Sequence, residues 1–379
     1  MKALVASIML LTVVAGCKRH RQEQGAPFSS ADSGTSATVS GRFTDEELRA
    51  FTALNPIDTH AHVRRTEPEF NAMIDRLNLH MLNIILVDDQ DPEEKDLQLE
   101  RYQALNFDHS AGGRAAFCTT FDPFKVNEPG FAESAIRSLD QDFDQGAIAV
   151  KIWKNLGMEI KDANGNYILP DNSALAPIYK DIAARDKTLV VHIADPDSAW
   201  APLDPASPDY SYYKENSFWF MYGKPHSSSK AQILLARDHI LEQNPNLRVV
   251  GAHLGSMEAD LHALAQHLDR YPNFAVDLAG RIPYLAQHPR AETIAFILKY
   301  QDRLLYATDN EFSPRFKMKP RMRFWEESYA RDWRFLATND TVEFEGAKGQ
   351  GLALPNPLLR KIYHDNAIRW FPGIYPGGR

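Results

Sequence analysis

The chain has few cysteines: only Cys17 and Cys118 occur among its 379 residues. Two cysteines cannot form the disulfide framework of a small secreted fold. A basic surplus is also missing, because 42 lysines and arginines face 50 acidic residues and give a formal net charge of -8. Nucleic-acid-binding proteins need positive charge to neutralise phosphates, so the composition argues against that class.

Signatures of repeated membrane spans and of nucleotide binding are missing as well. With 44% hydrophobic residues, 24% charged residues and a mean hydropathy of -0.40, the composition is that of a soluble globular protein. No Gly-x-Gly-x-x-Gly follows the first candidate strand, and no Gly-Lys-Ser/Thr phosphate loop is present. Nucleotide binding therefore has no support in the sequence.

Residues 1–17 have the pattern of a secretory signal. Lys2 precedes an apolar run over residues 3–14 that is too short to span a bilayer as a stable helix. Val-Ala-Gly-Cys then ends at Cys17 and resembles the bacterial lipobox, whose cysteine is lipidated. The alternative is an ordinary signal or anchor helix that contains Cys17 by chance. We predict an exported protein, lipid-anchored at the periplasmic or cell-surface face of a bacterial membrane, and Lys18 is compatible with the outer membrane.

Residues 18–43 are polar, small and rich in glycine, serine and threonine, which predicts a flexible tether. Thr-Asp-Glu-Glu at 44–47 has the pattern of a helix N-cap followed by acids in the first turn. The folded domain is therefore expected to comprise residues 44–379.

From residue 56 onward, short apolar runs alternate with helical patterns, as in a parallel sheet covered by helices. The candidate strands are 57–62, 84–87, 115–119, 148–153, 189–192, 249–253, 274–278 and 304–308. The candidate helices are 69–80, 93–105, 131–143, 175–185, 231–243, 257–268, 291–300 and 357–370. This order predicts an α/β fold, a (β/α)8 TIM-type barrel, although alternation alone leaves a doubly wound sheet as the competitor.

Two connections, 194–229 after the fifth strand and 310–355 after the eighth, are too long for simple turns. Both leave the carboxyl ends of strands, where barrel enzymes build their sites. We expect each to form a lid or a substrate wall, and the alternative is a surface excursion packed by its own aromatic residues.

Polar residues stand where several candidate strands end. His60 and His62 share one side of the first strand, because alternate strand residues point the same way, and two imidazoles can hold one divalent ion. His192, His253 and Asp309 each close or follow a later apolar run. One such histidine is more often structural, but the carboxyl ends of barrel strands meet at a single mouth. Five corresponding positions therefore predict a metal site.

These motifs resemble the amidohydrolase superfamily, in its amidohydrolase-related branch of metal-dependent hydrolases and nonoxidative decarboxylases. The matching segments occur in family order: Asp-Thr-His-Ala-His (58–62), Val-Val-His (190–192), Gly-Ala-His-Leu-Gly (251–255), Tyr-Ala-Thr-Asp (306–309) and Tyr-His-Asp-Asn-Ala (363–367). The resemblance implies a metal-dependent hydrolase fold with one divalent ion, commonly zinc, with manganese as the alternative. It also implies the ligands His60, His62, His192 and Asp309, with His253 beside the metal-bound water or the substrate.

In that setting Asp309 would be the general base, and His253 would polarise a carbonyl or stabilise negative charge. Lys151 on the fourth strand is open: some superfamily members carboxylate a lysine there to bridge two metals, but a charged or hydrogen-bonding group in the pocket is favoured. Lys154 and Arg281 are candidate substrate-binding cations beside Trp153, Trp200 and Trp219. Alternatively, Arg281 pairs with Asp277 and the tryptophans only pack.

Three functions follow, in order of preference. The first is a metal-dependent hydrolase that uses a metal-activated water on an amide, ester or lactone of a small organic substrate. The second is a metal-dependent nonoxidative decarboxylase of an aromatic or unsaturated acid. The third is a non-catalytic solute-binding lipoprotein, which would leave the histidines at the strand ends unexplained. The expected partners are a small-molecule substrate and a membrane reached only through the lipid anchor, and the sequence leaves the oligomeric state open.

Overall fold

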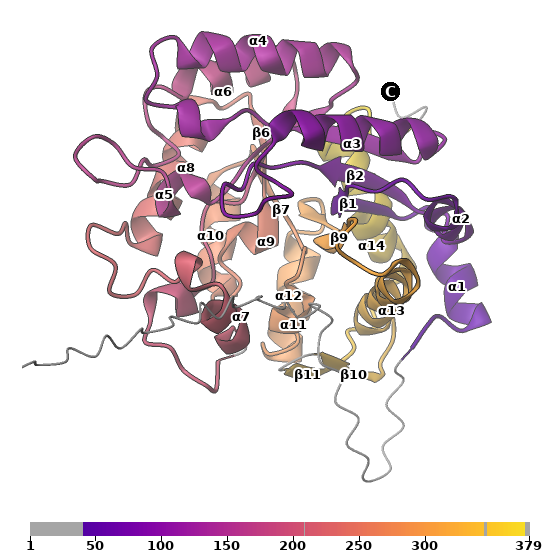
Figure 1. The fold of residues 1–379 in the computed structure, drawn as a ribbon. Helices are drawn as coiled ribbons and strands as arrows, with labels where there is room; N and C mark the ends of the chain where they lie inside the picture. The colour runs from indigo at the N-terminus through magenta and orange to yellow at the C-terminus, as the bar shows by residue number, and fades with distance from the viewer. Residues whose placement is uncertain (1–40, 208, 345–346, 376–379) are drawn as a thin grey trace, which may run out of the picture. The chain divides into compact units, whose positions relative to one another are not determined.

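The computed structural model describes residues 41–207, 209–344 and 347–375 (Figure 1). The predicted signal peptide, the lipidation site Cys17 and nearly all of the tether lie outside these residues. No helix in the described ranges is long and apolar enough to cross a membrane. The first helix, α1 (Asp45–Thr52), begins as predicted: Thr44 Oγ1 accepts from the Glu47 amide, and the Glu47 carboxylate accepts from the Thr44 amide.

Nine parallel strands form one sheet in the order β8-β7-β6-β5-β4-β3-β2-β1-β9 (Figure 1). They are β1 (Ile57–Val63), β2 (His80–Ile84), β3 (Ala115–Thr119), β4 (Ala149–Ile152), β5 (Thr188–Val191), β6 (Arg248–Gly251), β7 (Phe274–Asp277), β8 (Leu304–Leu305) and β9 (Asn310–Phe312). Strand β8 pairs with β7, and β9 pairs with β1, so these two consecutive strands are halves of one eighth strand. The residues between β8 and β9 also pair with β1, because Thr59 N–H donates to Tyr306 O (3.0 Å) and Asp309 N–H donates to His60 O (2.8 Å). The sheet thus closes, and the predicted (β/α)8 TIM-type barrel is confirmed.

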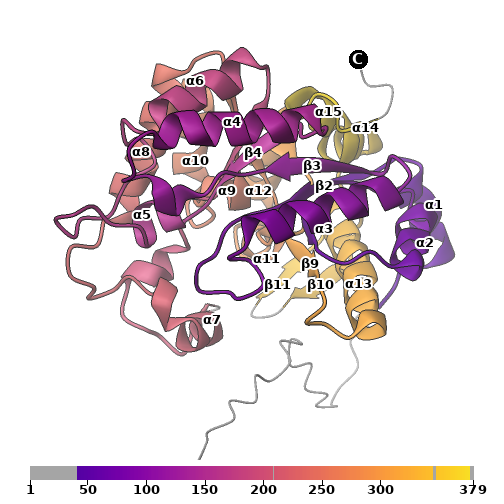
Figure 2. The ribbon, with the colours of Figure 1, turned by 45° about the horizontal axis from the view of Figure 1, so that its top comes forward.

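Helices follow the strands and cover the barrel; for example, α3 packs along β2 and β3 (Figure 2). They are α2 (Pro68–Arg76), α3 (Leu97–Ser110), α4 (Phe131–Asp144), α6 (Ala176–Ala184), α8 (Lys230–Gln243), α10 (Leu261–Arg270) and α12 (Arg290–Lys299), followed by α14 (Asn356–Arg360), the π-helical turn η4 (Lys361–Asp365) and α15 (Asn366–Trp370). Shorter helices lie in the connections: η1 (Pro123–Lys125), α5 (Asn155–Met158), α9 (Ala252–Gly255) and α11 (Ile282–Leu285).

Several element bounds expected from the sequence were wrong. For example, the helices expected at 93–105 and 257–268 begin four residues later, at Leu97 and Leu261. The strand expected at 84–87 begins four residues earlier, as β2. There His80 N–H donates to Pro56 O, and His80 is paired with Ile57 of β1. The single helix expected at 357–370 is interrupted by the π-helical turn η4, which an apolar pattern alone does not reveal.

The two long connections contain secondary structure of their own. The first has η2 (Asp197–Trp200), α7 (Tyr210–Glu215) and η3 (Ser217–Trp219), and the second has α13 (Met318–Ala337) and a hairpin of β10 (Thr341–Phe344) and β11 (Ala347–Gln350). In α13, Trp325, Tyr329 and Trp333 recur every four residues, as on one face of a helix, and their rings pack on Phe51 and Phe70. The second connection is therefore largely part of the core.

Candidate metal centre

The barrel mouth brings His60, His62 and Asp309 together. The nitrogen Nε2 of His60 lies 3.3 Å from Asp309 Oδ1, and Nε2 of His62 lies 3.2 Å from the same oxygen. Asp309 sits at the break between β8 and β9 with a φ of 63°, a left-handed conformation that aspartate tolerates better than most residues. Its side chain keeps 39% exposure, so the group faces the open mouth.

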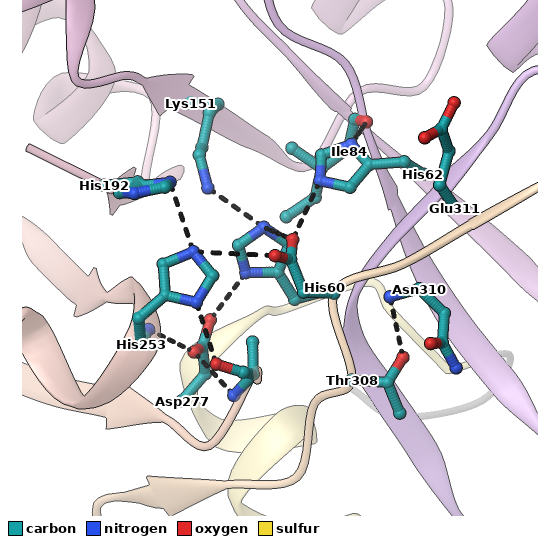
Figure 3. A network of polar contacts seen from close by, with 12 residues as sticks. His60, His62, Ile84, Lys151, His192, His253, Asp277, Thr308, Asn310 and Glu311 are labelled. Atoms are coloured by element: carbon teal, nitrogen blue, oxygen red, sulfur yellow. Dashed lines mark hydrogen bonds and ion pairs between the residues drawn. The ribbon is translucent and has the colours of Figure 1, made fainter. Parts of the chain in front are cut away.

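The rings of His60 and His62 are each oriented by a contact at Nδ1. His60 Nδ1 lies 2.9 Å from Asp277 Oδ2, and His62 Nδ1 lies 2.8 Å from the carbonyl oxygen of Ile84 (Figure 3). Such partners hold Nδ1 as the donor and leave Nε2 free to bind a metal. The buried Nζ of Lys151, on β4, lies 3.1 Å from His60 Nε2. Lys151 thus lies beside the candidate ligands.

His192 and His253 form a second pair. Nε2 of His253 lies 3.1 Å from Nδ1 of His192 (Figure 3). The same nitrogen lies 4.0 Å from Asp309 Oδ2. His192 does not join the group of His60, His62 and Asp309, whose ligand atoms all lie within 4.8 Å of one another. Its Nε2 is buried without a hydrogen-bond partner among the described residues, 3.6 Å from an Asp195 oxygen. The predicted fourth ligand therefore lies beside the other three, in contact with His253.

A left-handed turn presents His253. Residues 253–256 all have φ between 56° and 62°, although only one of the four is glycine. Asp277 Oδ1 accepts the amide hydrogen of His253 (2.7 Å), and the Ser256 hydroxyl donates to Ala194 O (2.7 Å). Gly251 precedes the turn, and a Cβ there would meet the Phe274 ring at 2.7 Å. This backbone is costly, so its persistence depends on these contacts.

Burial disfavours the charged form of three histidines at the mouth. It lowers the pKa of His60, that of His253 to about 3, and that of His192 well below its usual value. Desolvation alone would raise the pKa of Asp309, but its contacts with His253, His60 and His62 hold that pKa well below its usual range. Neutral imidazoles and an ionised carboxylate are the forms that bind metals.

The predicted substrate cations are placed differently. Lys154 is buried: its Nζ lies 2.9 and 3.0 Å from the Asp195 oxygens, donates to the Tyr212 hydroxyl, and sits 4.5 Å from the centre of the Trp219 ring. Its charge is thus engaged inside the protein, where it ties the first long connection to the barrel. The expectation that it is offered to a substrate finds no support in this geometry.

Arg281 does not pair with Asp277, the alternative raised by the sequence. Its Nε lies 3.6 Å from Glu258, and its side chain is 14% exposed. Asp277 instead contacts both His60 and the amide of His253. Sequence reasoning missed this role, although Asp277 ends the apolar run of β7 in the same way that the candidate ligands end theirs.

The donor set fits a divalent transition ion. Ligand atoms about 2.0–2.2 Å from one tetrahedral ion lie about 3.3–3.6 Å from one another. The separations of 3.2 and 3.3 Å from the two Nε2 atoms to Asp309 Oδ1 are close to the short end of that range. Two imidazoles and a carboxylate, oriented by further hydrogen bonds, are typical of zinc and manganese sites.

Comparison with known proteins places this geometry in a family. A family model described as Amidohydrolase matches residues 15–373, and no curated protein matches the chain. Similar solved structures include 5-carboxyvanillate decarboxylase from Novosphingobium aromaticivorans, complexed with manganese (15% identity, 83% of this chain and 95% of that chain, TM-score 0.49). Another is 4-oxalomesaconate hydratase from Rhodopseudomonas palustris (13% identity, 84% and 96%, TM-score 0.46).

The family model spans the barrel and every residue of the candidate metal centre. It confirms the family and the enzyme class predicted from the sequence motifs. The chain belongs to the amidohydrolase family.

Proposed function

We propose that the protein is a metal-dependent hydrolase that acts on an amide, ester or lactone of a small organic molecule. The observation that carries the proposal is the convergence of His60, His62 and Asp309, with His253 Nε2 4.0 Å from Asp309 Oδ2. A reacting carbonyl and its attacking water would fit between a carboxylate that takes protons and an imidazole nitrogen that accepts a hydrogen bond.

In this proposal His60, His62 and Asp309 hold one divalent ion, zinc or manganese. Such an ion polarises a carbonyl oxygen and lowers the pKa of a bound water toward about 7. Asp309 Oδ2, on the side toward His253, accepts the proton of the attacking water. His253 is oriented by donation from its Nδ1 to Ala279 O (2.8 Å), so its Nε2 presents a lone pair on the side of Asp309 and accepts a hydrogen bond from the attacking water.

A nonoxidative decarboxylase is the second candidate. The observation that favours it is Arg281, a partly exposed cation whose charge acts on Asp309 and Asp195 from the same mouth. Such a guanidinium would hold a substrate carboxylate. Hydrolases and decarboxylases would share the metal ligands, so the products of the reaction must separate them.

Metal analysis of the purified protein is the first test. About one zinc or manganese per chain supports the proposal, whereas two ions per chain would assign the His192–His253 pair and a carboxylated Lys151 to a second site. A panel of amides, esters, lactones and unsaturated acids then follows, with carbon dioxide measured separately. Carbon dioxide release without water addition would replace hydrolysis by decarboxylation. Tight ligand binding with neither metal nor turnover would favour a solute-binding protein.

A further inference from the structure

Asp277, at the end of β7, is a buried carboxylate that contacts both His60 and His253. Its side chain is buried, with 1% exposure. Oδ2 lies 2.9 Å from His60 Nδ1, while Oδ1 accepts the amide hydrogens of His253 (2.7 Å) and Ala279 (3.1 Å). Figure 3 shows Asp277 between the two histidine rings. Both of its oxygens are therefore used, each for a different histidine.

The His60 contact fixes which ring nitrogen carries the proton. A carboxylate only accepts hydrogen bonds, so Nδ1 of His60 must be the donor. The Nζ of Lys151 lies 3.1 Å from Nε2 of the same ring, and in its ammonium form it donates to the lone pair of that nitrogen. The two contacts on opposite sides of the ring thus agree on one tautomer, the one able to bind a metal through Nε2.

The contact with His253 supports its backbone. The Oδ1 of Asp277 receives the amide at the first residue of the left-handed turn 253–256. That turn sets the position of the His253 ring, which lies 5.1 Å from the His60 ring between centres. Loss of this acceptor would leave a buried amide unpaired at a strained position.

We propose that Asp277 is a positioning residue that couples the two halves of the site: Oδ2 sets the metal-binding tautomer of His60, and Oδ1 holds the turn that carries His253. The two effects are separable by substitution. In Asp277→Asn the amide oxygen still accepts from His253 and Ala279, whereas the amide nitrogen donates toward His60 Nδ1. The ring must then carry its proton on Nε2, which blocks metal binding while the turn stays in place. Asp277→Ala removes both effects.

The test measures Mn²⁺ affinity by electron paramagnetic resonance of the free ion in the purified protein. Asp277→Asn is expected to bind Mn²⁺ about 10–100-fold more weakly than the unmodified chain, at nearly the same thermal midpoint. The matched control is Asp142→Asn, which removes another buried carboxylate, paired with Arg101 and Thr119 away from the mouth. It should leave Mn²⁺ affinity unchanged. Equal affinity of Asp277→Asn and the unmodified chain would refute the coupling.

The metal measurement rests on the proposed function, so a second readout uses metal-free protein. Nitrogen-15 spectra of ring-labelled histidine, with His60 assigned through His60→Gln, should show the proton on Nδ1 in the unmodified chain and on Nε2 in Asp277→Asn. A proton on Nε2 of His60 in the unmodified chain would overturn the inference even if Asp277→Asn fails to fold. Absence of metal binding by the unmodified chain, with the proton on Nδ1, would count against the proposed function and leave the positioning role standing.

Discussion

Histidines are buried at both ends of the barrel, but their surroundings differ. At the carboxyl ends of the strands, His60, His62 and His253 lie within 4.0 Å of Asp309 oxygens. At the opposite end, His80 begins β2 and has no hydrogen-bond partner for Nδ1 among the described residues. Its ring instead lies 4.5 Å from that of Tyr375.

The contrast shows that burial alone does not mark a functional histidine. Burial lowers the pKa of His80 to about 4 and that of His253 to about 3, so both rings are neutral at pH 7. His364, beside His80, forms a structural hydrogen bond between its Nδ1 and the carbonyl oxygen of Asn55 (2.6 Å). What distinguishes the mouth is that several lone pairs and carboxylate oxygens converge there on one point.

Asp309→Asn should have the largest effect and should separate the two ends. The substitution keeps the shape of the side chain but removes a charged ligand and the proposed base, so turnover should fall by about 10²–10⁴-fold and metal affinity should weaken. His364→Asn, at the other end, should keep turnover within a few-fold. Steady-state kinetics and metal content of both variants provide the check. Similar losses in both variants would contradict the functional difference between the two ends of the barrel.

His253→Asn should separate two functions of the mouth, metal binding and turnover. Asparagine tolerates the left-handed backbone of residue 253 but cannot replace the imidazole contact with Asp309. We expect metal content to survive while turnover falls by about 10²–10³-fold, as for loss of a residue that orients the groups in a proton transfer. If the purified variant instead lacks metal, His253 is a ligand, and the two halves of the mouth are a single metal site.

Much of this contrast could be read from the sequence. Parallel strands end at a common edge, so His60, His62, His253 and Asp309 were predicted at one mouth from their positions after apolar runs. The support beneath them could not be predicted. The left-handed turn at 253–256 depends on contacts from β7 and on a glycine that lets the Phe274 ring approach, and neither has a local signal.

The long connections show a second limit. The spacing of Trp325, Tyr329 and Trp333 predicts a helix, but the many charges between them hide the pattern, and α13 was expected to be a lid or wall. Lys154 illustrates the reverse error, because a cation after a strand was assigned to the substrate. Its partner Tyr212 lies on α7, far away in sequence, and only the fold brings the two together.

Tyr329→Phe tests how far α13 supports the mouth. The Tyr329 hydroxyl donates to Oδ2 of buried Asp58 (2.8 Å), and the same carboxylate accepts from Thr308, next to Asp309. Loss of one donor to a buried carboxylate should lower the free energy of unfolding by about 1–3 kcal/mol, measured by urea denaturation. Tyr102→Phe, on an exposed face of α3, is the control and should change stability little. Equal stability of the two variants would mean that α13 only covers the barrel.

The end of the barrel opposite the mouth should make stability depend on pH. Burial, followed by repulsion from Arg114 and His364, lowers the pKa of His80 to about 4, below the ordinary value of 6.5. The unfolded chain therefore takes up a proton first as the pH falls, and stability attributable to His80 is lost between about pH 6.5 and 4, by at most about 1.4 kcal/mol per pH unit. His80→Phe, which keeps a ring beside Tyr375, should flatten the pH dependence of the urea midpoint in that window, whereas exposed His262→Gln should not. An unchanged slope in His80→Phe would show that the mouth, rather than the opposite end, contains the histidines that make the fold acid-sensitive.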